Sequence, residues 1–397
     1  MKQVFLTALG ILALLKSYTQ QAPDTTGYEN RKLKIEEVNL VSSYYGQTGD
    51  HGAVTGGLGA QKLTDIANVF DIRLAKYDRK LRKHTFGLEV GIDHFSSASY
   101  DKIDLKANSS ASWSDTRIYP SLTWTVENEK KGRSFGIGLS SSAEFDYHSF
   151  GANISFTQKT RDRNGEFSVR LQGYFDQVKL LTPIELRSGA GGGGGDGYDT
   201  DNRTTVAGSL SWSQVINKNL QVMVLADLVH QQGFLSLPFY RVYFNDGTVH
   251  QEKLPGSRFK IPLGFRANYF LGDKVIIRTY YRFYHDDWGI TAHTANLEVP
   301  VKITPFVSIS PFYRFYTQTA ATWFAPYQEH TSTDKYFTSN YDLSEFNSNF
   351  LGAGIRLAPP KGILGMQHFN MIELRYGRYT RSNNMNANSL SLNIRFK

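Results

Sequence analysis

Residues 86–93 read FGLEVGID, and apolar side chains alternate there with glycine or a charged residue at every position. Successive side chains of a β-strand point to opposite faces, so this stretch predicts a strand with one apolar and one polar face. The same alternation occurs at residues 118–126, 259–267 and 390–396. It therefore predicts an all-β chain.

Sixteen such segments follow one another to the last residue. Tight polar connections alternate with a second set that includes much longer ones, at 47–66, 97–113, 182–203, 232–257 and 319–347. This sorting is typical of an outer-membrane barrel, whose periplasmic turns are short and extracellular loops long. We predict a transmembrane antiparallel up-and-down β-barrel of about 16 strands. The predicted strands are 33–46, 67–77, 84–96, 114–127, 134–147, 149–160, 166–181, 204–216, 219–231, 258–270, 274–286, 289–301, 306–318, 348–358, 367–379 and 386–397.

The N-terminus has the pattern of an export signal. Lys2 precedes an apolar run at residues 4–15 that is too short to span a bilayer, and Ser17 and Thr19 form a small-x-small cleavage pattern. We predict a signal peptide at 1–19, a short flexible periplasmic leader at 20–32 and the barrel at 33–397. The localisation that follows is the bacterial outer membrane.

Composition excludes several classes of protein. The 397 residues contain no cysteine, which removes disulfide scaffolds, thiolate zinc sites and cysteine nucleophiles. No later apolar run approaches the roughly 20 residues of a spanning helix.

The polar face of the strands carries many charges. An apolar core could not hold them unpaired, so they pair with one another or face water. A barrel of about sixteen strands is wide enough for an aqueous channel, and an arginine excess favours anions. The alternative is an interior laced by salt bridges that conducts nothing. The predicted pore-lining residues are Arg73, Arg117, Arg170, Arg266, Arg278, Arg282, Arg314, Arg356, Arg375, Glu89, Asp93, Glu144 and Asp146.

Two groups of residues leave an enzyme open as the alternative. Glu144, Asp146 and His148 alternate along one predicted strand, which suggests a divalent-metal corner at the extracellular rim. His285 and Asp286 form a His/carboxylate pair of the kind that activates water. No G-x-S-x-G motif is present. We expect no enzyme, with an outer-membrane hydrolase as the alternative.

A glycine run at residues 191–195 leads into a short acidic stretch. Asp196, Asp199, Asp201 and Asn202 leave weak calcium binding open, although a flexible surface loop explains the stretch better. We expect no other cofactor. Basic residues are spread along strands and turns, which excludes a nucleic-acid partner. Aromatic residues near strand ends, Tyr284 and Trp288 among them, are expected in interfacial girdles.

Several motifs resemble one known family. KIEEVNL at 34–40, AVTGGLG at 53–59, GIDH at 91–94, SDTRIYP at 114–120 and EFDY at 144–147 are similar to the DUF3570 family in its Bacteroidetes type. The resemblance implies an outer-membrane barrel encoded beside a thioredoxin-like protein, a small lipoprotein and a flavin transferase. It therefore implies an extracytoplasmic redox role, and it draws attention to Asp93, Asp115, Arg117, Glu144 and Asp146.

The leading function is a channel or porin-like pore for small polar, anionic solutes, or the barrel component of an export or redox system. A non-conducting anchor barrel is a further alternative. Expected partners are outer-membrane lipid, the barrel-insertion machinery that reads a terminal aromatic strand ending near Phe396, a small lipoprotein and periplasmic redox proteins.

Overall fold

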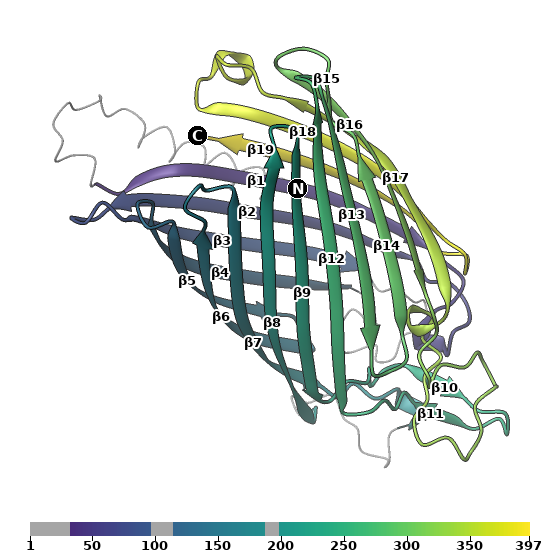
Figure 1. Cartoon of the computed structure of the whole chain (residues 1–397). Helices are drawn as coiled ribbons and strands as arrows, with labels where there is room; N and C mark the ends of the chain where they lie inside the picture. Colours follow the sequence, from purple (N-terminus) through teal and green to yellow (C-terminus); the bar gives the residue numbers. More distant parts are fainter. Residues whose placement is uncertain (1–31, 97–113, 187–197) are drawn as a thin grey trace.

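A computed structural model describes residues 32–96, 114–186 and 198–397. Its strands form one antiparallel sheet that closes on itself, because β1 pairs with both β2 and β19. β14 and β15 both lie between β13 and β16, so together they occupy one strand position in the wall (Figure 1). We call each strand position a stave, and the barrel has 16 staves. The predicted fold class is confirmed.

The strands follow the predicted segments closely. The main departures are earlier starts of β2 and β8, and a break at Pro300, which has no N–H to donate to the ladder. The strands are β1 (Lys34–Thr48), β2 (Leu63–Tyr77), β3 (Lys83–Ser96), β4 (Ser114–Asn128), β5 (Arg133–Ala143), β6 (Tyr147–Lys159), β7 (Gly165–Lys179), β8 (Thr200–Asn217), β9 (Leu220–Gly233), β12 (Ser257–Leu271), β13 (Val275–Asp286), β14 (Thr291–Glu298), β15 (Val301–Lys302), β16 (Val307–Gln318), β17 (Phe346–Leu357), β18 (Phe369–Arg381) and β19 (Asn386–Phe396).

The two faces of the sheet differ as the alternation requires. Ile92 and Leu122 point outward with 45% and 57% of their surfaces exposed, whereas Asp93 points inward and is 8% exposed. A closed barrel has no unpaired edge, so its backbone needs no water on the outside. The exposed apolar face is therefore suited to contact with lipid.

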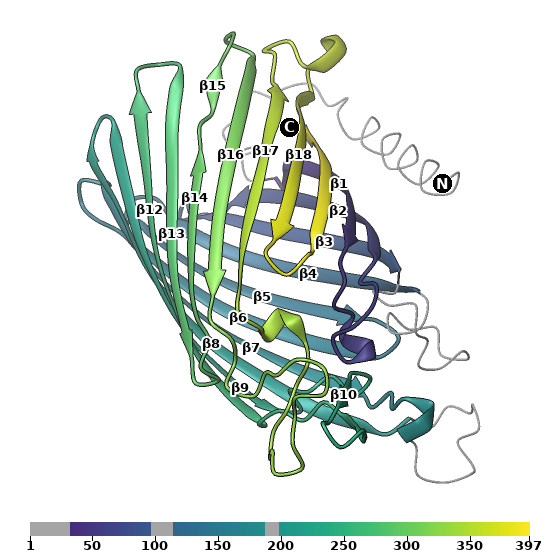
Figure 2. The same ribbon diagram turned by 90° about the vertical axis from the view of Figure 1, so that its right-hand side faces the viewer.

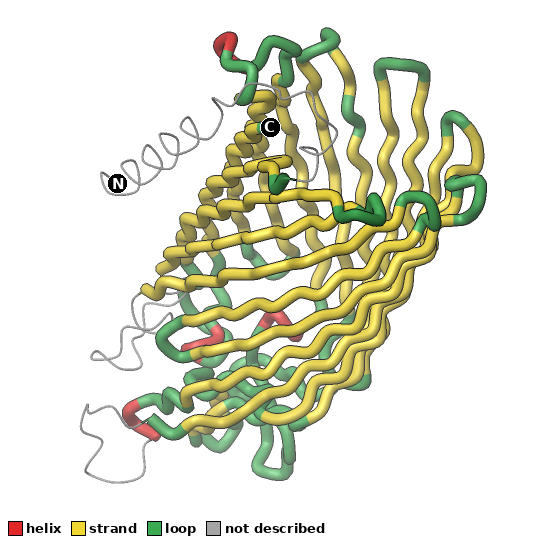
Figure 3. The backbone as a smooth tube through the Cα atoms, turned by 90° about the vertical axis from the view of Figure 1, so that its left-hand side faces the viewer, coloured by secondary structure: helices red, strands yellow, loops and turns green. Residues whose placement is uncertain are grey.

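The two ends of the barrel also differ. The C-terminus of β19 and the shorter turns lie at one end, and the longer connections lie at the other (Figures 1 and 2). The tube view of Figure 3 shows strands in almost all of the wall, with short helical turns confined to connections. Within the described residues, no helix is long and apolar enough to cross a bilayer. The predicted signal peptide and most of the predicted leader lie outside the described residues.

The longer connections pack together. We call four of them the mouth cap: residues 49–62, 180–186, 234–256 and 319–345. They contain the hairpin of β10 (Arg241–Tyr243) and β11 (Val249–Gln251), which lies within a stretch expected to be a loop. Val242, Phe244 and Phe337 form a buried apolar cluster inside the cap. Much of the best-buried apolar surface therefore lies in the loops.

The mouth cap joins opposite sides of the barrel. Six staves separate the β1–β2 pair from the β9–β12 pair in either direction around the wall. Nevertheless, Arg241 Nη1 of β10 donates a hydrogen bond of 2.9 Å to the carbonyl oxygen of Val54 in the β1–β2 connection. Gly56 has a φ of +73°, and a Cβ there would lie 2.5 Å from the ring of Tyr243. Such contacts require the connections to extend across the mouth.

Candidate functional site

The inner face of the barrel is identified by the strand registers. Asn39, Asp71, Glu89 and Ser121 are register partners on β1 to β4, so their side chains share one face. Followed around the barrel, these registers place eleven of the predicted pore-lining residues on that inner face: Arg73, Glu89, Asp93, Arg117, Arg170, Arg266, Arg278, Arg282, Arg314, Arg356 and Arg375.

Charge is segregated around this inner face. We call the inner face of β1–β9 the acidic wall. It carries Glu37, Asp65, Asp71, Glu89, Asp93, Asp115, Glu127, Glu166, Asp176, Asp201 and Asp227 against Arg73, Lys83, Arg117, Lys159, Arg170 and Arg203. We call the inner face of β12–β18 the basic wall. It carries Arg258, Lys260, Arg266, Arg278, Arg282, Lys302, Arg314, Arg356, Arg375 and Arg381 against Asp286, Glu298 and Glu373.

Part of the basic wall is neutralised locally. Arg375 Nη1 lies 3.0 Å from Glu298 Oε1 and 3.2 Å from Glu373 Oε1. Arg258 forms a 2.5 Å pair with Asp286, whose side chain is fully buried. These pairs use all three carboxylates of the wall.

Other arginines of the basic wall have no carboxylate partner in the described part of the chain: Arg266, Arg282, Arg314 and Arg356. Three of them lie over aromatic rings instead, with Arg266 5.6 Å from the Tyr280 centroid, Arg282 5.9 Å from Tyr284 and Arg314 5.9 Å from Phe350. A guanidinium on an aromatic face is held in place but keeps its charge and its donors. These groups therefore present positive charge to the lumen.

Cations of the acidic wall are mostly paired. Arg117 Nη2 lies 2.9 Å from Asp93 Oδ2, and the Tyr119 hydroxyl donates to Asp93 Oδ1 at 2.9 Å. Arg203 pairs with Asp176 at 2.9 Å, and Arg73 with Asp71 at 3.4 Å. Among the described residues, Arg170 has no carboxylate partner. The two walls thus differ both in net charge and in which sign is left unpaired.

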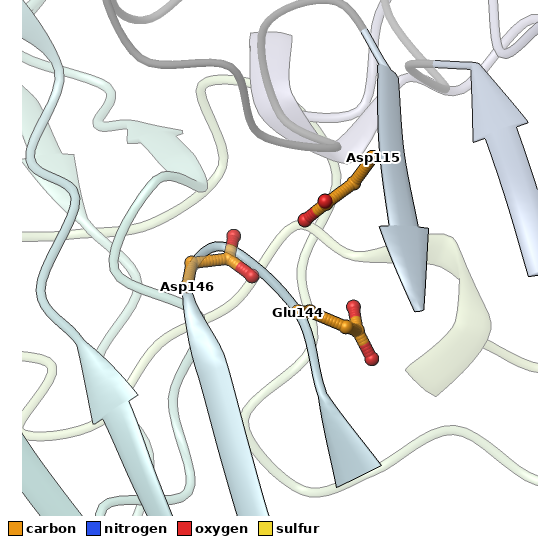
Figure 4. A group of neighbouring side chains, drawn as sticks. All are labelled: Asp115, Glu144 and Asp146. Atoms are coloured by element: carbon orange, nitrogen blue, oxygen red, sulfur yellow. The ribbon is translucent and has the colours of Figure 1, made fainter. Parts of the chain in front are cut away.

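Two of the three residues of the predicted metal corner lie together, next to a different third carboxylate. Glu144 and Asp146 lie in the turn between β5 and β6, and Asp115 of β4 joins them, with ligand oxygens within 4.8 Å of one another (Figure 4). His148 is not part of the group. It is the register partner of Ala143 and Gln177, and the neighbouring Ser149 points inward to Asp176. The alternation therefore directs His148 outward, which corrects the predicted set.

Burial and repulsion between carboxylates control the acidity of this corner. Burial and the Asp146 charge raise the pKa of Glu144 to about 7, and burial and Asp115 raise the pKa of Asp146. Asp115 accepts hydrogen bonds from the backbone N–H groups of Thr116 (2.7 Å) and Phe145 (3.1 Å), so it anchors the turn. Three carboxylates suit a hard cation such as Ca²⁺, but one oxygen from each supplies only three of its usual six to eight ligands.

The second predicted catalytic pair is divided between the two faces. Asp286 points inward and accepts hydrogen bonds from the Tyr284 hydroxyl, the Arg258 guanidinium and two backbone N–H groups. His285 points outward, where its Nδ1 lies 3.0 Å from Thr291 Oγ1. The two side chains cannot act on one water, and Asp286 has a structural role.

The mouth cap contains a carboxyl group in its interior. Glu252 is 6% exposed, and it accepts hydrogen bonds from Thr338 Oγ1 at 2.5 Å and from the Leu237 N–H at 2.7 Å. Burial raises its pKa to about 7. Glu252 thus links the β9–β12 connection to the β16–β17 connection.

The predicted calcium loop is only partly described. Asp196 lies outside the described residues. Asp199 immediately precedes β8, Asp201 and Asn202 belong to that strand, and Asp201 Oδ1 accepts a hydrogen bond from the Asn202 N–H.

Sequence comparison identifies the family of this barrel. The family described as protein of unknown function, DUF3570, matches residues 95–392. The chain belongs to the DUF3570 family. The matched range includes SDTRIYP and EFDY, whereas the motifs at 34–59 precede it. No curated protein matches this DUF3570 chain significantly.

Solved structures with a similar fold are barrels of Gram-negative bacteria. OccK9 (OpdG) of Pseudomonas aeruginosa shares 9% identity over 92% of this chain and 99% of its own, with a TM-score of 0.45. A BenF-like porin from Pseudomonas fluorescens Pf-5 shares 8% identity over 91% and 98%, with a TM-score of 0.43. The siderophore receptor PirA of Acinetobacter baumannii shares 11% identity over 88% and 53%, with a TM-score of 0.47. At these values the similarity transfers no function.

Proposed function

We propose that this DUF3570 protein is an outer-membrane pore that conducts small polar solutes and prefers anions. The observation that carries the proposal is the set of inward-facing arginines on the basic wall that lack a carboxylate partner among the described residues. Charged groups in a closed barrel stay ionised without partners only where water reaches them. Unpaired guanidiniums in a water-filled lumen concentrate anions there.

The proposed orientation places the mouth cap outside the cell and both termini in the periplasm. The outward apolar face supports a position in lipid, and the sorting of short and long connections supports the direction of insertion. Because connections from opposite sides meet in the mouth cap, the pore is proposed to be gated rather than permanently open. We propose that the side chains of the lumen interact with passing solutes and do not catalyse a reaction. The positions of His285 and Asp286 on opposite faces of the wall support this proposal.

The orientation can be tested with single cysteines, because the chain contains none. Asp246 lies at the exposed tip of the β10–β11 hairpin, and Lys130 lies in the exposed β4–β5 turn at the opposite end of the barrel. Each is replaced by cysteine in turn. A membrane-impermeant maleimide should label intact cells only through Asp246→Cys. Labelling of Lys130→Cys alone would show that the barrel has the opposite orientation, with the mouth cap in the periplasm.

Conduction can be tested in planar bilayers with the refolded chain. We expect discrete conductance steps. In a KCl gradient, the sign of the reversal potential should indicate a preference for chloride. A correctly folded barrel that does not conduct would favour the anchor alternative. Cation preference would show that the unpaired arginines do not control permeation.

A further inference from the structure

A hollow interrupts the inner face of the basic wall on β16–β18. Gly352 of β17 and Gly377 of β18 are register partners, so two adjacent inward positions carry no side chain. A Cβ on Gly352 would lie 2.5 Å from the Phe312 ring, and a Cβ on Gly377 would lie 2.5 Å from the Phe350 ring. The two glycines therefore let both rings lie close against the wall.

The two rings form an apolar floor. The centroids of Phe312 and Phe350 are 5.1 Å apart with an interplanar angle of 50°. Above this floor is a cavity of about 260 Å³ with a polar edge, which is also lined by Asn296, Glu298, Ser389 and Ser391. A cavity of this size lies just below the usual range of ligand pockets, so it suits only a small molecule.

Two guanidiniums stand at the edge of the cavity in different electrostatic states. Arg375 lies 5.0 Å from the Phe312 centroid and is balanced by Glu298 and Glu373. Arg314 lies over Phe350, is solvent-exposed and has no carboxylate partner in the described part of the chain. The cavity therefore offers one uncompensated positive charge beside an apolar surface.

We propose that this cavity binds small organic carboxylates that have an apolar body. The carboxylate would accept hydrogen bonds from the planar guanidinium of Arg314, and the apolar part would cover the floor of Phe312 and Phe350. An inorganic anion would use the charge but not the floor, and a neutral aromatic molecule would use the floor but not the charge. Weak binding suits a site that a permeating solute must leave again.

The proposal rests on the lumen being the functional space of a pore, and binding can be measured separately from conduction. The test uses the full mature chain in detergent micelles, with calorimetric titration of phenylacetate, acetate and 2-phenylethanol. Phenylacetate should bind at least tenfold more tightly than either of the other two. Equal affinity for acetate and phenylacetate would overturn the role of the floor, and equal affinity for 2-phenylethanol would overturn the role of the charge.

Variants locate the site. Arg314→Gln should weaken phenylacetate binding at least tenfold, and Arg314→Lys should weaken it less because the charge remains without the planar fork. Arg266→Gln is the matched control, since Arg266 is another unpaired arginine stacked on a ring but lies on β12, away from the cavity. Its affinity for phenylacetate should stay within twofold of the unmodified protein. If Arg266→Gln loses as much affinity as Arg314→Gln, binding is a property of the whole wall and the cavity site is wrong.

Bilayer recordings separate this proposal from the pore itself. Phenylacetate should add current fluctuations that Arg314→Gln abolishes, while the other unpaired arginines retain part of the anion conductance. If the barrel binds phenylacetate through Arg314 but does not conduct, the proposed pore function is wrong and the binding site is still supported. A conducting, anion-preferring barrel without phenylacetate binding would do the opposite.

Discussion

The acidic and basic walls of the lumen are built from the same alternating strands but use charge differently. On the acidic wall, arginines such as Arg117 and Arg203 are tied to carboxylates. On the basic wall, Arg266, Arg282 and Arg314 rest on aromatic rings and have no carboxylate partner among the described residues. Arg117 and Arg203 also lie over tyrosine rings, so the two walls differ in the carboxylate partner and not in the aromatic support. A guanidinium on a ring without a carboxylate keeps its charge, which leaves one side of the lumen able to interact with solutes.

The largest expected effect concerns the most deeply buried ion pair of the basic wall, Arg258 with Asp286. Arg258→Ala should lower the free energy of unfolding by about 3–5 kcal/mol, because it leaves a buried carboxylate without its cation. Arg73→Ala on the acidic wall is the control. Its partner is Asp71, but the Arg73 side chain is 54% exposed, so the loss should be less than about 1 kcal/mol. Urea unfolding from micelles measures both free energies. Equal losses would show that burial of the ion pair does not determine the cost of removing its arginine.

The next effect concerns the mouth cap, which spans both walls. The pKa of Glu252 is raised to about 7 from an ordinary value of 4.5, so the folded cap retains a proton that the opened cap loses. Cap stability should therefore be greatest below about pH 4.5 and fall by about 3 kcal/mol as the pH rises to about 7. Hydrogen exchange of cap amides, corrected for intrinsic rates, should show this fall. Glu252→Gln should show a flat profile, and Glu345→Gln, at an exposed position, should keep the pH dependence.

Ion selectivity tests the two walls directly. Replacing Arg266, Arg282, Arg314 and Arg356 together by glutamine should reduce the chloride-to-potassium permeability ratio several-fold, because it removes the unpaired charge. Glu89→Gln on the acidic wall should raise the same ratio slightly. Reversal potentials measure both, and no change in the fourfold variant would show that the basic wall does not control permeation.

The smallest expected effect is at the acidic corner of Asp115, Glu144 and Asp146. The raised pKa of Glu144 means that the barrel loses stability as the pH rises from about 4.5 to about 7. Asp146→Asn removes a repelling charge, so it should raise the melting temperature at pH 8 by a few degrees and change it little at pH 4. Added Ca²⁺ should stabilise the unmodified chain more than this variant. A variant that melts lower at pH 8 would show that Asp146 is stabilising as a carboxylate.

Prediction from sequence succeeded where local alternation was sufficient. The sixteen strands and the chain of tight turns follow from a period of two, and the same period separates the inner from the outer positions. It failed for Tyr284 and Trp288, which were expected in an interfacial girdle. Tyr284 donates to Asp286 inside the lumen, and Trp288 lies 2% exposed beneath Arg258. An aromatic residue near a strand end can face either side, and only the register decides which.

The sequence by itself determined the class of fold, the number of staves and the residues available to the lumen, because side-chain direction in a strand alternates regardless of what the strand pairs with. Tertiary structure alone decided which charges share a wall, how Asp115 replaces His148 beside Glu144, and how Gly352 and Gly377 make room for two rings. It also decided that loops from opposite staves meet over the mouth. These features depend on closure of the barrel, which brings together residues that are far apart along the chain.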